Sequence, residues 1–269
     1  TVNAPLNSDA EALYLNGDSD SSTDSADSIT FTDGLTMTAA TVITLQATTS
    51  GIVPAGKLTL SAQTGVYITD DMSGAASSKA LVINADSDST GSSGTLTVAT
   101  GKTVTSNKSD VTITAWDLDL AGTAALTAGT SSITIHGAEA GQSIGLGTTT
   151  TAMDISDSEL GRLTALGGGL TLGSATSGSI LVQGITASSS DALAAVWLSA
   201  TRDEATVTFS SQGSTLNALS VTADKGIVVN GVNINADTGI LHLDGDSDSS
   251  TDSADSITFT DGLTMTAAT

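Results

Sequence analysis

Apolar and polar residues alternate in short runs along the whole chain. In most of these runs each apolar residue is followed by Thr or Ser, and Gly, Asp, Asn or Ser residues bound the run. Such alternation is typical of a strand with one buried face, and the bounding residues are those that form turns. We therefore predict an all-β chain with many strands of roughly four to six residues. The runs begin at Ile29, Leu35, Leu58, Val66, Leu81, Leu96, Val111, Ile133, Leu170, Val207 and Leu219.

The spacing between the runs favours a coil of stacked rungs, a β-solenoid. Ile68, Ile83, Val98 and Ile113 follow one another at equal intervals, whereas the spacing elsewhere is irregular. Solenoids tolerate such variation because their loops lengthen on the outside while the inward residues stay stacked. The alternative is a row of immunoglobulin-like sandwiches of about 100 residues, each with a buried aromatic anchor. The scarcity of tryptophan favours the solenoid, because the chain has only 2.

An internal repeat defines the expected domain organisation. Residues 17–41 and 245–269 are identical, letter for letter. We interpret 1–16 as the end of a preceding divergent repeat, 17–244 as one full repeat and 245–269 as the start of the next, all in one continuous solenoid. At an assumed rung of about 22 residues, a repeat holds roughly ten rungs and spans about 50 Å. We expect the chain to be part of a longer tandem array.

Composition agrees with a narrow coil that has a small-residue core. Aromatic residues make up 3% of the chain, 28 residues are Gly and the mean hydropathy is +0.18. Bulky aromatic side chains would not fit the interior of such a coil, whereas Ala, Val, Ile and Leu would. The positive hydropathy argues against disorder despite the low sequence complexity.

Charge excludes several classes of partner. Seven Lys and Arg residues oppose 29 Asp and Glu residues, which gives a net charge of −22. Such a surface cannot neutralise a phosphate backbone, so we expect no nucleic acid partner. It also repels anionic lipid surfaces, and no apolar run approaches the ~20 residues of a membrane-spanning helix. With 0 cysteines, the chain has neither disulfides nor thiolate metal ligands.

The segment 219–246 resembles the repeats of filamentous-haemagglutinin-type adhesins. It contains Gly226-Ile-Val-Val, then Ile234-Asn-Ala, then Gly239-Ile-Leu-His-Leu-Asp-Gly, in the order seen in that family. Segments 80–100 and 111–122 are looser instances. The resemblance implies a right-handed parallel β-helix, secretion and a role at the cell surface. It brings no catalytic residues, and a repeat as long as 17–244 is not a feature of that family.

An acidic tract provides the candidate metal site. Carboxylates and hydroxyls recur at alternate positions from residue 18 to 24, a spacing that can place oxygen ligands around Ca²⁺. However, no Gly stands at the sixth position, and Ile29 replaces the final Glu of a helix-loop-helix calcium site. A solvated acidic loop is therefore the alternative, and Asp86 and Asp88 form a shorter version. The candidate ligands are Asp18, Asp20, Asp24, Asp246, Asp248 and Asp252.

Two segments fit poorly with the alternation of apolar and polar residues that is typical of the strands. Ser156 and Glu159 have the spacing of a capping box, which predicts a short helix there. In residues 191–200, Leu193, Val196, Trp197 and Ala200 would share one helical face. A degenerate rung is the alternative for either segment.

We predict that the chain is not an enzyme. His136 and His242 stand alone, and Arg162, Arg202 and Glu159 form no recognisable constellation. The sequence has no phosphate-binding glycine loop, Ser-His-Asp order or zinc spacing. A polysaccharide-cleaving β-helix would need convergent carboxylates and aromatic platforms for sugar rings.

Ladders of threonine are the basis of one further alternative, ice binding. Outward columns of Thr could form a flat face, although Thr is also simply favoured in strands. The residues concerned are Thr36, Thr38, Thr59, Thr97, Thr112 and Thr114.

Taken together, these features predict a structural or adhesive module that forms a rigid acidic rod, fibre or sheath outside the cell. The expected partners are neighbouring repeats or other copies of the chain, joined end to end or laterally, and cell-surface or glycan receptors. Ca²⁺, held by the acidic tract, is the candidate cofactor.

Overall fold

A computed structural model describes residues 1–20, 27–249 and 255–268. Within these ranges the regular structure is β-strand apart from one turn of α-helix, α1 (Asp157–Leu160), and one of 3-10 helix, η1 (Ala187–Ser189). The strands pair in parallel throughout the described sheets, so the predicted all-β parallel β-helix is confirmed. Two compact units make up the chain, unit 1 (residues 1–133) and unit 2 (residues 134–269).

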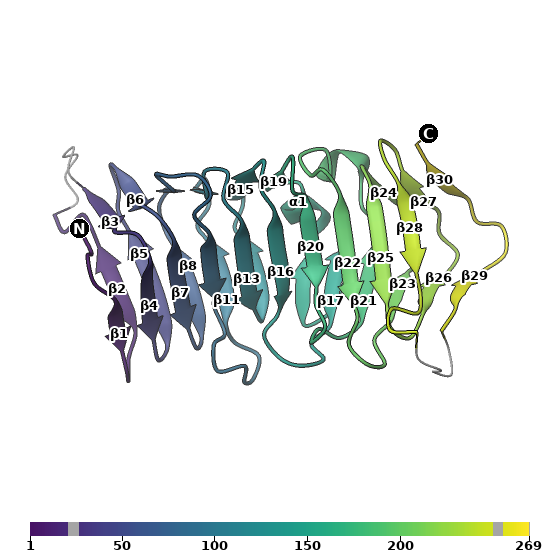
Figure 1. Ribbon diagram of the computed structural model, residues 1–269, viewed down its shortest axis with the longest axis horizontal. Coiled ribbons are helices and arrows are strands. Elements are labelled where there is room, and N and C mark those ends of the chain that lie inside the picture. Colours follow the sequence, from purple (N-terminus) through teal and green to yellow (C-terminus); the bar gives the residue numbers. More distant parts are fainter. Residues whose placement is uncertain (21–26, 250–254, 269) are drawn as a thin grey trace. The chain divides into compact units, whose positions relative to one another are not determined.

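Unit 1 has three parallel faces, and the chain visits them in turn (Figure 1). Face I contains β1 (Leu6–Ser8), β4 (Leu35–Ala39), β7 (Leu58–Ala62), β10 (Leu81–Asn84) and β13 (Val111–Ala115). Face II contains β2 (Leu13–Asn16), β5 (Val42–Gln46), β8 (Gly65–Ile68), β11 (Thr95–Val98) and β14 (Asp117–Leu120). Face III contains β3 (Ser28–Phe31), β6 (Gly51–Pro54), β9 (Met72–Ser73), β12 (Thr103–Thr105) and β15 (Ala125–Gly129).

Unit 2 repeats the same construction. Face IV contains β20 (Leu170–Gly173), β22 (Val196–Ala200), β25 (Leu219–Ala223) and β28 (Leu241–Asp244). Face V contains β18 (Met153–Ile155), β17 (Ile144–Gly147), β21 (Ile180–Gln183), β23 (Val207–Phe209), β26 (Ile227–Val229) and β29 (Ile257–Phe259). Face VI contains β24 (Ser214–Leu216), β27 (Ile234–Ala236) and β30 (Met265–Ala267). β16 (Ile133–Gly137) begins at the junction of the units, and β19 (Leu163–Ala165) follows α1.

The core is formed by the inward residue at every second strand position. On face I, Met37 aligns with Leu60 and Leu60 with Ile83, and none of these side chains is exposed. Leu58 is the register partner of Leu35, so the number of residues in one coil here is close to the rung of about 22 residues assumed from the sequence. Apolar side chains stacked in register exclude water along the coil, and this burial is the main favourable term in its stability.

The equal spacing of four apolar residues noted in the sequence does not mark a single column. Ile68 is aligned with Val98 on face II, and Ile83 with Ile113 on face I. Successive members of the series therefore alternate between two faces, and each true column contains every second member.

The structure resolves both irregular segments. Residues 157–160 form α1, with the N–H of Glu159 donating to Ser156 Oγ and the N–H of Ser156 donating to Glu159 Oε2, so the predicted capping box is confirmed. The helical alternative for residues 191–200 is wrong. Val196 to Ala200 form strand β22, in which Trp197 points outward, because pairing with β20 and β25 satisfies the backbone on both sides.

The identical sequence forms strands at equivalent positions in both copies of the repeat, although β29 and β30 are shorter than β3 and β4. Residues 29–31 and 37–39 lie in β3 and β4, and their equivalents in the second copy, residues 257–259 and 265–267, are β29 and β30. The local fold of the repeat is therefore set by its own sequence.

Candidate functional site

The predicted metal ligands lie in acidic corners, turns that follow the ends of strands. Three corners share the pattern Asn/Asp-Gly/Ala-Asp-Ser-Asp: residues 16–20 after β2, 84–88 after β10 and 244–248 after β28. Asp24 and Asp252 of the predicted set lie outside the described residues.

The same local hydrogen bond forms each corner. The N–H of Asp18 donates to Asn16 Oδ1 at 2.8 Å, and the N–H groups of Asp86 and Asp246 donate to the side chains two residues earlier at 3.2 Å. This side-chain turn explains why Asn or Asp occupies the first position.

The two aspartates of a corner have opposite environments. The first is buried at two corners, with Asp18 4% and Asp86 0% exposed, whereas the second, Asp20 or Asp88, is exposed. Asp86 packs so closely against Gly94 that a Cβ on this glycine would lie 2.2 Å from the Asp86 Cβ. At the third corner, Asp246 Oδ1 is shielded from solvent and makes no hydrogen bond within the described chain. The sequence indicated acidic loops at these positions, but it predicted neither the side-chain turn nor the burial of the first carboxylate.

The corners do not assemble into a metal centre from protein groups alone. Among residues 1–20, 27–249 and 255–268, no three His, Cys, Asp or Glu side chains are grouped to hold a metal ion. Asp18, Asp20, Asp246 and Asp248 supply hard oxygen ligands, which suit Ca²⁺ when water completes its coordination. Calcium binding therefore stays a prediction for these residues.

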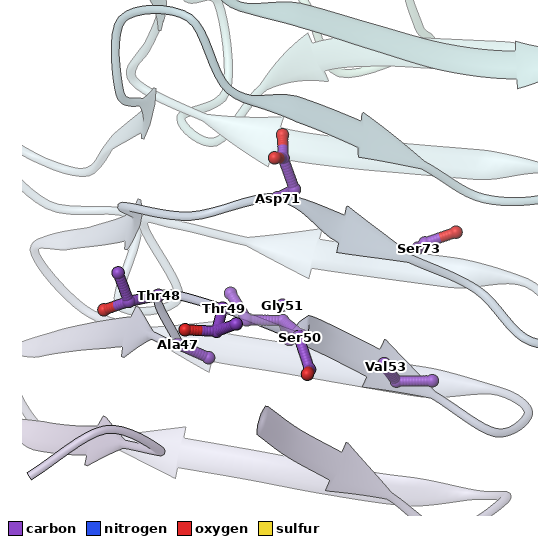
Figure 2. Close-up of a pocket in the computed structure, with 9 residues that line it drawn as sticks. Ala47, Thr48, Thr49, Ser50, Gly51, Val53, Asp71 and Ser73 are labelled. Atoms are coloured by element: carbon purple, nitrogen blue, oxygen red, sulfur yellow. The ribbon is translucent and has the colours of Figure 1, made fainter. Parts of the chain in front are cut away.

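A shallow hollow lies where β5 turns into β6 (Figure 2). It encloses about 210 Å³ and is lined by residues 47–53, Asp71 and Ser73. Asp71 Oδ1 accepts a hydrogen bond from the N–H of Thr103 at 2.7 Å, and the carbonyl of Asp71 accepts one from the N–H of Ile52. Its only charged side chain is thus bonded to backbone, so the hollow has no general base paired with a nucleophile.

Ion pairs in unit 1 join turns of different coils. Lys102 Nζ lies 2.7 Å from Asp70 Oδ1, and the second oxygen of Asp70 accepts the buried N–H of Ala47 at 3.0 Å. The hydrogen bond to Asp70 raises the pKa of the Lys102 ammonium. Lys79 Nζ lies 2.5 Å from Asp33, and this hydrogen bond lowers the pKa of the Asp33 carboxyl. Both ion pairs therefore link turns that belong to different coils of unit 1.

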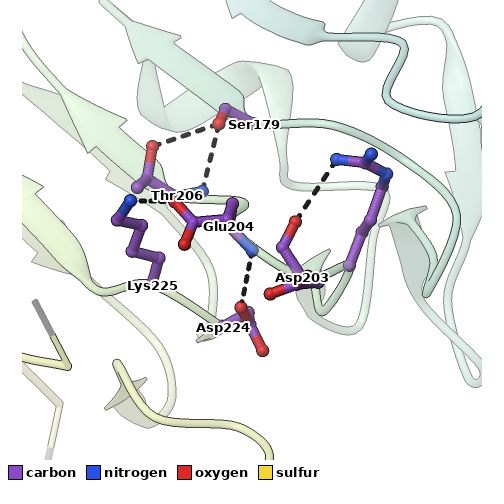
Figure 3. A network of polar contacts seen from close by, with 7 residues as sticks. Ser179, Asp203, Glu204, Thr206, Asp224 and Lys225 are labelled. Carbon is purple, nitrogen blue, oxygen red and sulfur yellow. Dashed lines mark hydrogen bonds and ion pairs between the residues drawn. The ribbon is translucent and has the colours of Figure 1, made fainter. Parts of the chain in front are cut away.

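Unit 2 has a comparable network among its turns (Figure 3). Ser179 Oγ accepts from both the N–H and the hydroxyl of Thr206, at 3.1 and 3.2 Å. The N–H of Glu204 donates to Asp224 Oδ2 at 2.8 Å, and the Glu204 carboxylate pairs with Lys225. These groups connect successive coils and leave no converging set of acid and base.

The isolated ionisable residues named in the sequence have local contacts. His136 Nδ1 lies 3.0 Å from the carbonyl of Gly137, and Glu159 caps α1. Arg202 donates to the carbonyl of Asp203 at 3.3 Å. None of these contacts joins two of the candidate residues, and the absence of an enzymatic activity stays a prediction.

The threonine ladders are partly regular. On face I, Thr36 aligns with Thr59 and Thr38 with Ser61, but Val82 stands between Thr59 and Thr112 in the first column. Thr97 belongs to β11 on face II and is not part of this surface.

No protein-family model, curated protein or solved structure matches the chain. The resemblance to filamentous-haemagglutinin-type adhesins therefore rests on sequence motifs alone, those of segment 219–246 and of the looser segments 80–100 and 111–122. No helix in the described part of the chain is long and apolar enough to cross a membrane.

Proposed function

We propose that the chain is an extracellular structural and adhesive module, a stiff acidic spacer that carries binding surfaces along its length. The observation that supports this best is the register of the coil. Within each unit, most strands pair in parallel with the strand one coil further on, and their inward residues are mainly apolar. Such a coil gains stability with each added rung, because every rung contacts only its neighbours.

The charge of the chain suits this role. At −22, copies of the chain repel one another at low ionic strength, which keeps a long polymer soluble. Salt and divalent cations screen that repulsion outside the cell, where lateral association would then become possible. The exposed aspartates of the acidic corners, such as Asp20, are accessible to such cations.

A length measurement tests the structural part of the proposal. Chains with one, two and four tandem copies of residues 17–244 should appear in electron micrographs as rods whose length grows by about 50 Å per copy. Leu60→Asp in a single copy is the matched control, since it places a charge in the core and should introduce a bend at that point. Compact particles, or beads joined by flexible segments, would overturn the proposal.

The threonine columns of face I support ice binding as a second candidate function. Thr36, Thr38, Thr59 and Ser61 form a two-by-two array in register, which offers hydroxyls at regular spacing to ordered water. Thermal hysteresis of the chain, abolished by Thr36→Val with Thr59→Val, would support it. A freezing point equal to that of a matched albumin solution would dispose of it.

A further inference from the structure

Both tyrosines of the chain lie in one outward column. Tyr14 of β2 aligns with Thr44 of β5, and Thr44 aligns with Tyr67 of β8. The two tyrosine side chains are 55% and 40% exposed. Neither ring is part of the buried core of the coil. We name this column, Tyr14-Thr44-Tyr67, ring ladder 1.

The geometry of ring ladder 1 is regular. Its rings are separated by two strand spacings, about 9.6 Å along the coil axis. The Tyr14 hydroxyl bonds to Gln46 of the next strand. A Cβ on Gly65 would lie 3.2 Å from Cε2 of Tyr67, so the Tyr67 ring lies close above this glycine. Gln46 and Gly65 thus restrict how the two rings can turn.

Unit 2 has a second column of the same construction. On face IV, Trp197 aligns with Ser220 and Ser220 with His242, and Ser220 Oγ lies 3.3 Å from His242 Nδ1. Trp197 is 37% exposed, and a Cβ on Gly169 would lie 2.3 Å from its ring. Because Gly169 has no Cβ, the indole ring of Trp197 can pack directly against the backbone at this position. We name this column, Trp197-Ser220-His242, ring ladder 2.

Most of the surface around the two ladders is uncharged. No outward residue of β2, β5, β8, β11, β20, β22 or β25 carries a charge. The charges that lie on the same faces are all acidic: Asp117 and Asp119 of β14, and Asp244 of β28 beside His242. In a chain with a net charge of −22, such faces repel anionic ligands least and give no cation to hold them. The matching ligand is therefore neutral.

We propose that the two ring ladders bind neutral polysaccharides as extended chains laid along the coil. Alternate sugar rings would stack their C–H faces on the exposed aromatic rings, and Thr44 or Ser220 would bond to hydroxyls of the intervening sugar. Rigid aromatic side chains give large contact at small entropic cost. This inference rests on the adhesive part of the proposed function and names its ligand.

The composition of the ladders favours a sugar over a protein partner. Hydroxyl side chains separate the rings, whereas the centre of a protein interface is a contiguous apolar patch. An alternation of aromatic and hydroxyl groups instead matches a ligand whose own C–H and hydroxyl groups alternate.

The test uses cellulose and chitin particles and their soluble hexasaccharides as probes. Titration calorimetry with the hexasaccharides should give two sites per chain for at least one of the two. Tyr14→Ala with Tyr67→Ala should remove one site, and Trp197→Ala with His242→Ala the other, each weakening its site about tenfold or more. Thr208→Ala with Val228→Ala is the matched control, because these two outward residues are aligned on face V and neither is aromatic, and it should change nothing.

Three outcomes would overturn the inference: no binding of either probe, binding that survives all four ring substitutions, or binding lost equally in the face V control. Self-association that the ring substitutions abolish, measured by light scattering without sugar, would assign the ladders to a second copy of the chain instead. The rod measurement is independent of the ring side chains. Failure of the sugar test with rods intact therefore removes the ligand and leaves the structural proposal standing.

Discussion

Replacing Leu60 by alanine tests the assignment of inward and outward positions. Leu60 is the central residue of β7 and is 0% exposed, with Met37 and Ile83 aligned on either side and equally buried. The substitution removes three carbon atoms, which at about 0.8 kcal/mol each gives about 2.4 kcal/mol of lost transfer free energy. Neighbours held in register on both sides cannot close the gap fully, so the cavity should bring the loss to about 3–4 kcal/mol.

The assay is urea unfolding followed by circular dichroism, with Thr59→Ala as the matched substitution on the same strand. Thr59 points outward and is only half-buried, so its loss should cost about 0.5 kcal/mol or less. Because side chains alternate between faces, a shift of register by one residue would exchange the two results. Equal effects of the two substitutions, or a larger effect of Thr59→Ala, would refute the assigned register.

Three further predictions concern polar groups. Lys102→Met should lower stability at neutral pH because it removes the ion pair with Asp70. Since Asp70 raises the pKa of Lys102, the ion pair should stabilise the fold fully below the unfolded pKa of lysine, and this stabilisation should be lost as the pH rises through the folded pKa. Melting curves recorded above about pH 10 can follow the loss. Ser156→Ala should cost about 1 kcal/mol in urea unfolding by removing the cap of α1, whereas the exposed Ser158→Ala should not. Millimolar Ca²⁺ should raise the melting temperature, and Asp18→Asn with Asp246→Asn should abolish the increase; an unchanged melting temperature in the parent chain would contradict calcium binding at the corners.

Sequence pattern alone predicted which side chains point inward but not which strands are neighbours. The alternation from Leu58 to Ser61 matches β7 residue for residue, because period-2 burial is a local property. Ile68 and Ile83 belong to one regularly spaced series yet lie on different faces, since loop lengths decide where a coil closes. The segment around Trp197 fits both a helical and a strand period, and only pairing with β20 and β25 selects the strand.

The same distinction between local features and contacts across coils applies to the candidate sites. The acidic tract that begins at Asp18 could be identified from the sequence because its carboxylates are close together in the chain, whereas the side-chain turn between Asn16 and Asp18 was found only in the structure. The burial of Asp18 and the alignment of Tyr14 with Tyr67 could not be predicted from the sequence, since both depend on contacts between coils. No local pattern links the two tyrosines, because they lie two coils apart.

The internal repeat connects the two ring ladders and gives one more prediction. In the alignment of the two copies, Tyr14 is equivalent to His242, and the inward residues that flank them, Leu13 and Leu15, are equivalent to Leu241 and Leu243. One ladder begins at this position and continues to Tyr67, while the other ends there, two strands after Trp197.

In a chain with two tandem repeats, the ladders should therefore fuse at the junction into one column with three rings at every second coil. Binding at linked subsites adds affinity without new contacts, so this chain should hold an oligosaccharide long enough to span all three rings more tightly than either ladder alone. Titration of one-repeat and two-repeat chains with the same oligosaccharide measures this gain, and His242→Ala at the junction should remove it. Equal affinities in the two chains would mean that the ladders act separately, and that the ring at this position in each repeat is not placed to extend one surface into the next.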